Sequence, residues 1–247
     1  MSKRYLAILS VLVASCDSAQ QLKTASGHPI QYYLSLPDGW SASRKWPVVI
    51  VIESANRDFQ ATAEVFAKAR QKMPFILATP LVVTNGGANY RGVPTYRYSD
   101  DVWNEIQRDT CRFDMDGLAA VAADVRKLYV GEDTIFLTGW EAGGHTIWSM
   151  IFQHPELLRA AALSGPNYQG RCLAEGSFST APARVNLPVR VFQGETSNQY
   201  PAIQFEAAKK DAEAHGYRNV TRSVVAGKPH GPLADEILAY FQSLIQP

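Results

Sequence analysis

The sequence predicts a single α/β domain, in which a mostly parallel sheet is covered by helices on both faces. Stretches typical of strands alternate along the chain with stretches of helical periodicity, which is the pattern of such sheets. The 247 residues suffice for one domain with a large core. No internal repeat, low-complexity segment or shift of composition marks a second domain.

The expected strands are short runs rich in apolar and β-branched residues: residues 30–36, 47–52, 75–78, 134–137, 160–163, 189–192 and 220–225. Helical periodicity occupies stretches between and after them: residues 59–72, 116–129, 145–153, 202–215 and 233–245. Asp116 suits a first helical turn, and Leu118 and Val121 belong to an apolar stripe. Ligand sites of such sheets lie beyond the carboxyl ends of the strands, so the functional residues are expected there.

The first residues resemble a bacterial secretory signal. MSKR carries two positive charges, and the apolar segment YLAILSVLVA is too short to span a bilayer comfortably as a permanent helix. The segment Val13-Ala14-Ser15-Cys16 resembles a lipobox, which implies removal of residues 1–15 and lipidation of Cys16. Asp17 resembles the inner-membrane retention signal of Gram-negative lipoproteins, which implies the periplasmic face of that membrane. An ordinary signal peptide or a retained anchor is the alternative.

The small, polar residues 16–29 are expected to form a flexible tether, which leaves residues 30–247 as the folded domain. The whole chain has a formal charge of +1, and removal of Lys3 and Arg4 with the signal brings it near −1. This balance gives no indication of binding to nucleic acid or to an anionic surface. Contact with the membrane is therefore expected only through the lipid anchor.

Two cysteines, Cys111 and Cys172, remain in the expected domain. In an oxidising compartment, two leftover thiols favour a disulfide. Their spacing does not show whether the Cα atoms come close enough to be bridged, so the paired and unpaired states both stay open. The sequence also leaves the oligomeric state open.

The stretch Gly139-Trp140-Glu141-Ala142-Gly143 has the glycine spacing of a strand–turn–helix elbow. An expected strand precedes it and an expected helix follows it. With the order of the elements and the ending GKPHG at residues 227–231, it resembles the α/β-hydrolase superfamily. The resemblance is to compact esterases related to polyhydroxybutyrate depolymerases and feruloyl esterases. It covers roughly residues 30–245 and implies an α/β-hydrolase fold with a minimal cap at residues 164–187.

Residue by residue, the resemblance gives Glu141 the position of the nucleophile, which is usually serine, and His230 the position of the catalytic histidine. The backbone N–H of Ala142 would be one donor of the oxyanion hole. The triad acid is missing, because Ser197 occupies its place. Two polar residues near that place in the sequence could orient the histidine instead: Glu195 and Asn198.

A third departure follows the expected strand at residues 47–52, where these esterases usually show His-Gly. This chain has Glu53-Ser54, and Ser54 would narrow the backbone freedom that glycine gives an oxyanion hole. Four residues beyond strand ends are candidate binding residues: Glu53, Asn56, Asn167 and Tyr168. His145, one helical turn after Glu141, is expected to be buried with its polar groups satisfied.

These departures exclude an ordinary serine esterase at this site, because no hydroxyl stands where attack must begin. The leading hypothesis is a pseudoenzyme of esterase descent that binds a small-molecule or carbohydrate-like ligand at the old site. In it, Glu141 and His230 would share a charged hydrogen bond. No cofactor is expected.

The main alternative is an atypical hydrolase that uses Glu141 as nucleophile or base together with His230. Related α/β-hydrolases that cleave carbon–halogen bonds or epoxides use aspartate in this way. Weaker alternatives are a metal held by Glu53, Glu141 and His230 and an interaction module that uses other surfaces. The leading hypothesis itself includes no metal.

Overall fold

The computed structural model describes residues 20–247 except 86–90, 92, 175, 199 and 246–247. The expected signal peptide, Cys16 and Asp17 lie outside the described residues. Within the described part of the chain, no helix is both long and apolar enough to cross a membrane.

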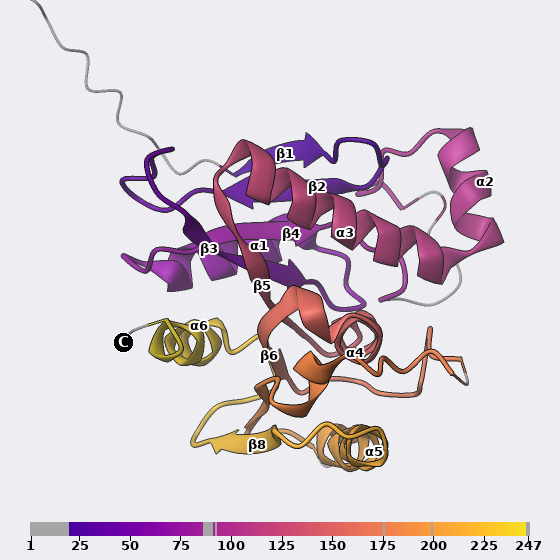
Figure 1. Cartoon of the computed structure of the whole chain (residues 1–247), viewed down its shortest axis with the longest axis vertical. Coiled ribbons are helices and arrows are strands. Elements are labelled where there is room, and N and C mark those ends of the chain that lie inside the picture. The colour runs from indigo at the N-terminus through magenta and orange to yellow at the C-terminus, as the bar shows by residue number, and fades with distance from the viewer. Residues whose placement is uncertain (1–19, 86–90, 92, 175, 199, 246–247) are drawn as a thin grey trace, which may run out of the picture.

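Within the described residues, eight strands form one sheet in the order β1-β2-β4-β3-β5-β6-β7-β8 (Figure 1). Pairs β1–β2 and β2–β4 are antiparallel, and all the other neighbours are parallel. The predicted mostly parallel sheet is therefore confirmed. The strands are β1 (Gln21–Thr24), β2 (Gln31–Ser35), β3 (Trp46–Ile52), β4 (Ile76–Pro80), β5 (Gly131–Trp140), β6 (Leu158–Ser164), β7 (Val189–Gly194) and β8 (Val220–Val225).

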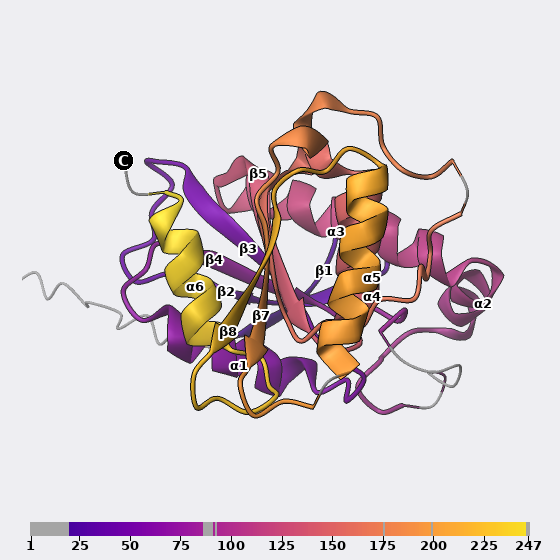
Figure 2. The same cartoon turned by 90° about the horizontal axis from the view of Figure 1, so that it is seen from below.

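Helices cover both faces of this sheet. One face carries α1 and α6, and the other carries α3, α4 and α5 (Figure 2). The helix α2 packs on α3 rather than on the sheet. The helices are α1 (Phe59–Arg70), α2 (Asp100–Arg108), α3 (Thr110–Leu128), α4 (Gly143–Gln153), α5 (Tyr200–Ala214) and α6 (Ala234–Ser243), with short 3₁₀ turns at η1 (Pro155–Leu157) and η2 (Pro182–Val185).

The central strand β3 shows why its sequence is continuously apolar. All of its residues are buried. Val49 and Val51 pack in the core under α1 and α6, whereas Ile50 and Ile52 pack in the core on the opposite face. Successive side chains of a strand point to opposite faces, and helices cover both faces here, so every position is apolar.

Two elements differ from the sequence-based expectation because they are polar. The helix α2 was not predicted, since only Trp103 and Ile106 are buried along it. The helix α3 begins at Thr110 rather than at residue 116, and the Asp109 carboxylate caps it by accepting a hydrogen bond from the Arg112 N–H at 2.9 Å.

The expected flexible tether at residues 16–29 is wrong from Gln21 onward. Residues 21–24 form β1, which pairs with β2. After this strand, Ala25 is buried, and the Ser26 N–H donates to the Asp124 carboxylate at 2.9 Å. The side chains of this edge strand are mostly exposed, so its sequence lacks the apolar alternation that marks a half-buried strand.

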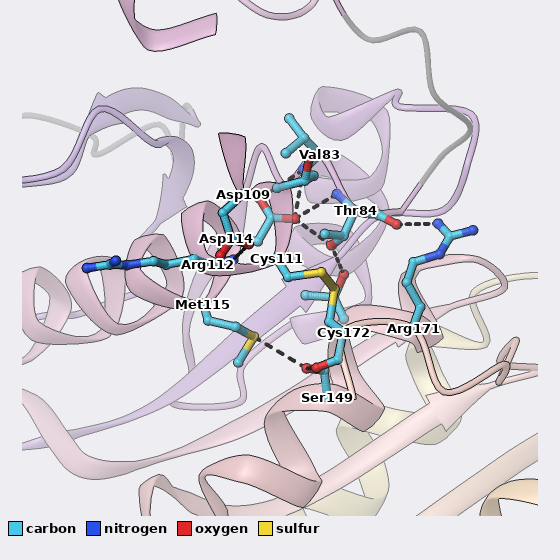
Figure 3. The surroundings of a disulfide bond; sticks show 12 residues. Val83, Thr84, Asp109, Cys111, Arg112, Asp114, Met115, Ser149, Arg171 and Cys172 are labelled. Carbon is cyan, nitrogen blue, oxygen red and sulfur yellow. Dashed lines mark hydrogen bonds between the residues drawn. A yellow bond between two sulfur atoms is a disulfide. The ribbon is translucent and has the colours of Figure 1, made fainter. Parts of the chain in front are cut away.

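A disulfide joins Cys111 to Cys172, with Cα atoms 5.4 Å apart, which answers the question that the sequence left open. It connects the start of α3 to the loop between β6 and β7 (Figure 3). The carbonyl oxygen of Cys172 also accepts a hydrogen bond from the Gln153 side chain at 3.0 Å. This loop is therefore attached to both α3 and α4.

Asp114, one turn after Cys111, attaches α3 to the segment that follows β4. Its buried carboxylate accepts hydrogen bonds from the N–H groups of Val83 at 2.9 Å and Thr84 at 2.7 Å, and from the Thr84 hydroxyl (Figure 3). The Thr84 hydroxyl also lies 2.7 Å from that of Thr146 on α4. Burial raises the pKa of Asp114 to about 6, although the hydrogen bonds from Thr84 and Val83 oppose the rise.

The disulfide should stabilise the fold measurably. It closes a loop with a sequence separation of 61, so the double variant Cys111→Ala/Cys172→Ala should lose about 3 kcal/mol of unfolding free energy. Urea denaturation of both proteins, with and without reductant, measures the difference. Reductant should lower the stability of the wild type and leave that of the variant unchanged. Equal stability of wild type and variant without reductant would contradict the expectation.

Asp114 should make stability depend on pH in the direction opposite to an ordinary paired carboxylate. Its folded-state pKa of about 6 exceeds the ordinary aspartate pKa of 3.8, so its stabilising contribution is full below pH 3.8 and is lost as pH rises through 6. Relative to Asp114→Asn, the wild type should lose about 2 kcal/mol of unfolding free energy between pH 4 and pH 7.5. A difference that stays constant with pH, measured by denaturation, would refute this.

Candidate functional site

The turn from β5 to α4 has the elbow geometry that the glycine spacing predicted. At its tip, Glu141 has a φ of 49°, in the left-handed region that costs a non-glycine residue about 1 kcal/mol. The Glu141 N–H donates to the Ser164 carbonyl at 3.1 Å, and its own carbonyl accepts from the N–H groups of Asn167 at 2.8 Å and Gly144 at 3.0 Å. These contacts hold the strained turn in place.

Close packing of β3 against the turn explains the two glycines that frame it. A Cβ atom on Gly139 would lie 2.2 Å from the carbonyl oxygen of Ile52. A Cβ atom on Gly143 would lie 2.6 Å from the carbonyl oxygen of Glu53. Backbone approaches this short leave room only for glycine.

Two groups at the tip have no partner within the described residues. The N–H of Ala142, the expected oxyanion donor, forms no hydrogen bond there. The carboxylate of Glu141 likewise forms neither a hydrogen bond nor an ion pair with any described residue. Among the described residues, neither the Ala142 N–H nor the Glu141 carboxylate is therefore engaged in another contact.

The candidate binding residue Glu53 lies beneath the turn instead of facing a ligand. Its side chain is 1% exposed. The carboxylate accepts hydrogen bonds from the Ser54 hydroxyl at 3.1 Å, the Thr62 hydroxyl and the Trp140 indole N–H at 3.3 Å. These three internal donors occupy the carboxylate, so Glu53 fixes the Trp140 side chain that precedes the tip.

Ser54 and Asn56 belong to the same turn after β3. Ser54 is fully buried, and its hydroxyl accepts a hydrogen bond from the Asn56 N–H at 3.3 Å, while Asn56 itself is exposed. The Asn85 side-chain amide donates to the carbonyl groups of Glu53 and Ser54, each at 2.9 Å. The Asn85 side-chain oxygen is buried and has no partner in the described part of the chain.

His230 lies at the elbow, as the order of elements implied. Its ring centroid is 5.8 Å from that of Trp140, at an interplanar angle of 50°. On its other side, a Cβ atom on Gly165 would come within 2.8 Å of the imidazole. The exposed imidazole therefore sits in a slot between the Trp140 indole and the Gly165 backbone.

The charged hydrogen bond expected between Glu141 and His230 is absent among the described residues. Three residues were expected to be possible orienting groups for the histidine: Glu195, Ser197 and Asn198. Glu195 instead accepts from the Gly227 N–H at 2.8 Å, and Asn198 accepts from a backbone N–H at the start of α5 at 3.0 Å. The Ser197 hydroxyl is buried without a partner in the described part of the chain. Among the described residues, packing rather than an acid therefore positions the imidazole.

Tyr168, expected at the lip of a binding pocket, belongs to the core. It is 6% exposed and packs against Trp148 and Phe152. Its hydroxyl donates to the Asp211 carboxylate at 2.5 Å, and burial raises its pKa. Asn167 is partly buried, and its backbone N–H holds the carbonyl of the elbow tip. It is thus part of the site through its backbone.

His145 is buried as expected, with 5% of its surface exposed. Burial, assisted by the charge of Arg171, lowers its pKa to about 4, so the imidazole is neutral at pH 7. Its Nδ1 atom has no partner among the described residues, so the expectation that its polar groups are satisfied is wrong.

A pocket of about 800 Å³ opens beside His230, on the side of α1 and α6. Lys68, Lys228 and Glu236 line it, and the last two form an ion pair of 3.4 Å. Glu141 does not line this pocket. His230 therefore borders the elbow on one side and this pocket on the other.

The sequence did not point to Trp140 and Thr62, which both donate hydrogen bonds to the Glu53 carboxylate. The Trp140 indole also contacts His230. One signal was present: β3 and β5 are neighbouring parallel strands, so the residues that follow or end them lie together. Among the described residues, no group of three or more His, Cys, Asp or Glu side chains could hold a metal ion. The weaker alternative of a metal on Glu53, Glu141 and His230 therefore has no assembled site in this structure.

Glu53 should be essential to the fold through its acceptor atoms rather than through its charge. In Glu53→Ala, the buried Ser54 and Thr62 hydroxyls and the partly buried Trp140 N–H lose their acceptor, which should lower the unfolding free energy by about 3 kcal/mol. In Glu53→Gln, the amide oxygen can serve Thr62 and Trp140, so the loss should stay below about 1 kcal/mol. Denaturation curves of the two variants check this; equal losses would rule out the acceptor role.

Solved structures similar to this chain come from ester-cleaving and related enzymes. The poly(3-hydroxybutyrate) depolymerase LpqC from Bordetella parapertussis matches with a TM-score of 0.63 and 15% identity, over 92% of this chain and 90% of its own. A putative dienelactone hydrolase from Klebsiella pneumoniae matches with a TM-score of 0.61 and 17% identity, over 88% and 89% of the two chains. Esterase PE8 matches with a TM-score of 0.61 and 17% identity, over 91% and 100%.

No protein-family model matches the chain, and no curated protein matches it by sequence. Likeness at such low identity establishes the architecture alone. Together with the mostly parallel sheet and the strand–turn–helix elbow, these matches show that the chain has the α/β-hydrolase fold.

Proposed function

We propose that this protein is of esterase descent and binds a small-molecule or carbohydrate-like ligand at the β5–α4 turn without cleaving esters. The observation that carries the proposal is the carboxylate of Glu141, held at the tip of a strained turn with no partner among the described residues. Strain of this kind persists where the surrounding structure enforces it, and it concentrates at functional sites.

The rest of the site supports binding over ester cleavage. No hydroxyl occupies the tip, and within the described residues no acid is hydrogen-bonded to His230. Nucleophile, base and acid act as one catalytic unit, so loss of any member removes most of the rate. A scaffold with only the histidine left at its position retains a place to bind a ligand rather than a way to attack it.

The second candidate is an atypical hydrolase in which Glu141 attacks carbon and His230 activates water. The unpartnered carboxylate and the adjacent Ala142 N–H favour it. Among the described residues no acid is hydrogen-bonded to His230, which weighs against it, because the histidine that activates water needs such a partner. An alkyl ester on Glu141, found by mass spectrometry after incubation with haloalkanes and epoxides, would establish this second function.

We also propose that the protein is a lipoprotein, attached through Cys16 to the periplasmic face of the inner membrane. Cys16 lies outside the described residues, so the support is indirect. The Cys111–Cys172 disulfide fits an oxidising compartment. Labelling of cells with a fatty-acid analogue, in wild type and Cys16→Ala, tests the attachment.

Ester hydrolysis gives the direct test of the leading function. Wild type and Glu141→Ala should hydrolyse short-chain aryl esters no faster than buffer, because neither has a nucleophilic hydroxyl. The double variant Glu141→Ser/Ser197→Asp restores both the nucleophile and the acid and should gain activity, as long as His230 stays in place.

The decisive comparison is wild type against Glu141→Ala. Hydrolysis by the wild type that disappears in Glu141→Ala would make the glutamate a working catalyst and overturn the proposal. Glu141→Gln should also be silent, and it controls for the size of the side chain.

A further inference from the structure

The pocket of about 800 Å³ beside His230 is lined by α1, by α6 and by the segment between β8 and α6. These two helices cover the same face of the sheet (Figure 2). The volume is within the range of small-molecule sites, which is roughly 300–1,000 Å³. Glu141 does not line this pocket, so a molecule bound in it occupies a different place from the ligand proposed at the β5–α4 turn.

Apolar side chains form much of the pocket wall. Val65 on α1 has 43% of its surface exposed, and Ala69, one helical turn further on, is buried. Leu233 and the prolines Pro229 and Pro232 line the pocket from the segment before α6. A ligand that covers this wall removes apolar surface from water, which favours binding.

The charged residues of the pocket wall balance one another. Counted without His230, Lys68 and Lys228 contribute two positive charges, and Asp235 and Glu236 contribute two negative charges. Lys228 and Glu236 also form an ion pair of 3.4 Å. Neither an anion nor a cation therefore meets a net opposite charge in these four residues, although either would lose part of its hydration on entering. This balance favours an uncharged ligand.

Contacts within the protein hold the wall in place. The carbonyl oxygen of Lys228 accepts hydrogen bonds from the N–H and the hydroxyl of Thr196, each at 3.1 Å. A Cβ atom on Gly194 would lie 2.3 Å from the carbonyl oxygen of Pro229, so the end of β7 packs directly against this segment. The wall is therefore formed without a ligand, as is usual for small-molecule pockets.

Two residues that line the pocket have a strained backbone. Gln71, directly after α1, has a φ of 48°, and Leu233, directly before α6, has a φ of 44°. Both values lie in the left-handed region, which side chains other than glycine rarely adopt. Such strain persists where the surrounding structure enforces it, and it concentrates at functional sites. The backbone therefore indicates a functional surface independently of the chemistry of the lining.

We propose that this pocket is a second binding site, which takes an uncharged molecule with an apolar chain and places that chain against Val65, beside His230. The apolar wall supplies the affinity, and the balanced charges give no advantage to an ion. The inference does not depend on the proposed function, because Glu141 is not part of the pocket.

The straight-chain alcohols 1-butanol, 1-hexanol and 1-octanol are suitable probes, because they differ only in the length of the apolar chain. The full chain carrying Cys16→Ala lacks the proposed lipid and can be kept free of detergent, whose tails would compete. Titration followed by the amide NMR signals of residues 228–236 gives the affinities and the place of binding. The affinity should rise about threefold with each added CH₂ group, because each group buries more apolar surface.

Hexanoate and hexylammonium carry the chain of a C6 alcohol with a charged end group. Titrated at pH 8, both ions should bind about threefold or more weakly than 1-hexanol, because each loses hydration without meeting a net opposite charge.

Replacements of two exposed valines separate the pocket from the rest of the surface. Val65→Asn puts a polar, uncharged side chain into the wall and should weaken binding of 1-hexanol about fivefold, whereas Val65→Leu should keep the affinity. Val224→Asn is the matched control, because Val224 lies on β8 outside the pocket, is 60% exposed and should not affect binding.

The inference is overturned if 1-octanol leaves the signals of residues 228–236 unchanged, or if the affinity does not rise with chain length. Tighter binding of either ion than of 1-hexanol, or equal affinities of Val65→Asn and Val224→Asn, would do the same. None of these results bears on the proposed function, whose own test follows ester hydrolysis by variants of Glu141.

Discussion

The site depends on one constraint, the left-handed backbone of Glu141 between β5 and α4. The carbonyl of Ser164 and the N–H of Asn167 fix this conformation, and β3 packs so closely beside it that only glycine fits at positions 139 and 143. The backbone at the tip is therefore held by contacts from β3 and from the segment after β6. The residue at the tip of this turn is a glutamate, and the turn has the strand–turn–helix geometry nonetheless.

Next to this turn, three side-chain donors share one buried acceptor, the carboxylate of Glu53. Ser54, Thr62 and Trp140 all donate to the buried Glu53, and Trp140 in turn forms one wall of the slot that holds His230. In an esterase of this fold, an acid would orient the histidine. Among the described residues, the ring is instead positioned by its packing against the Trp140 indole and the Gly165 backbone.

The loops that border the site are held by contacts to α3. The Cys111–Cys172 disulfide attaches the segment after β6, and Asp114 attaches the segment after β4. Asp114 serves this purpose at an electrostatic cost, because burial raises its pKa to about 6. The buried Asp114 carboxylate accepts hydrogen bonds from two backbone N–H groups and a hydroxyl. Such a buried network restricts the conformation of the loop more than an exposed carboxylate would.

The sequence by itself determined the strands with buried faces, the elbow and the position of His230, because apolar periodicity and glycine spacing are local and are written in consecutive residues. It did not reveal β1 or α2, whose exposed side chains carry no apolar pattern. Only the tertiary structure decided that Tyr168 is core, that Glu53 holds Trp140 and that Cys111 meets Cys172. Each of these depends on which distant segments the packed sheet brings within bonding distance, and no local pattern encodes that.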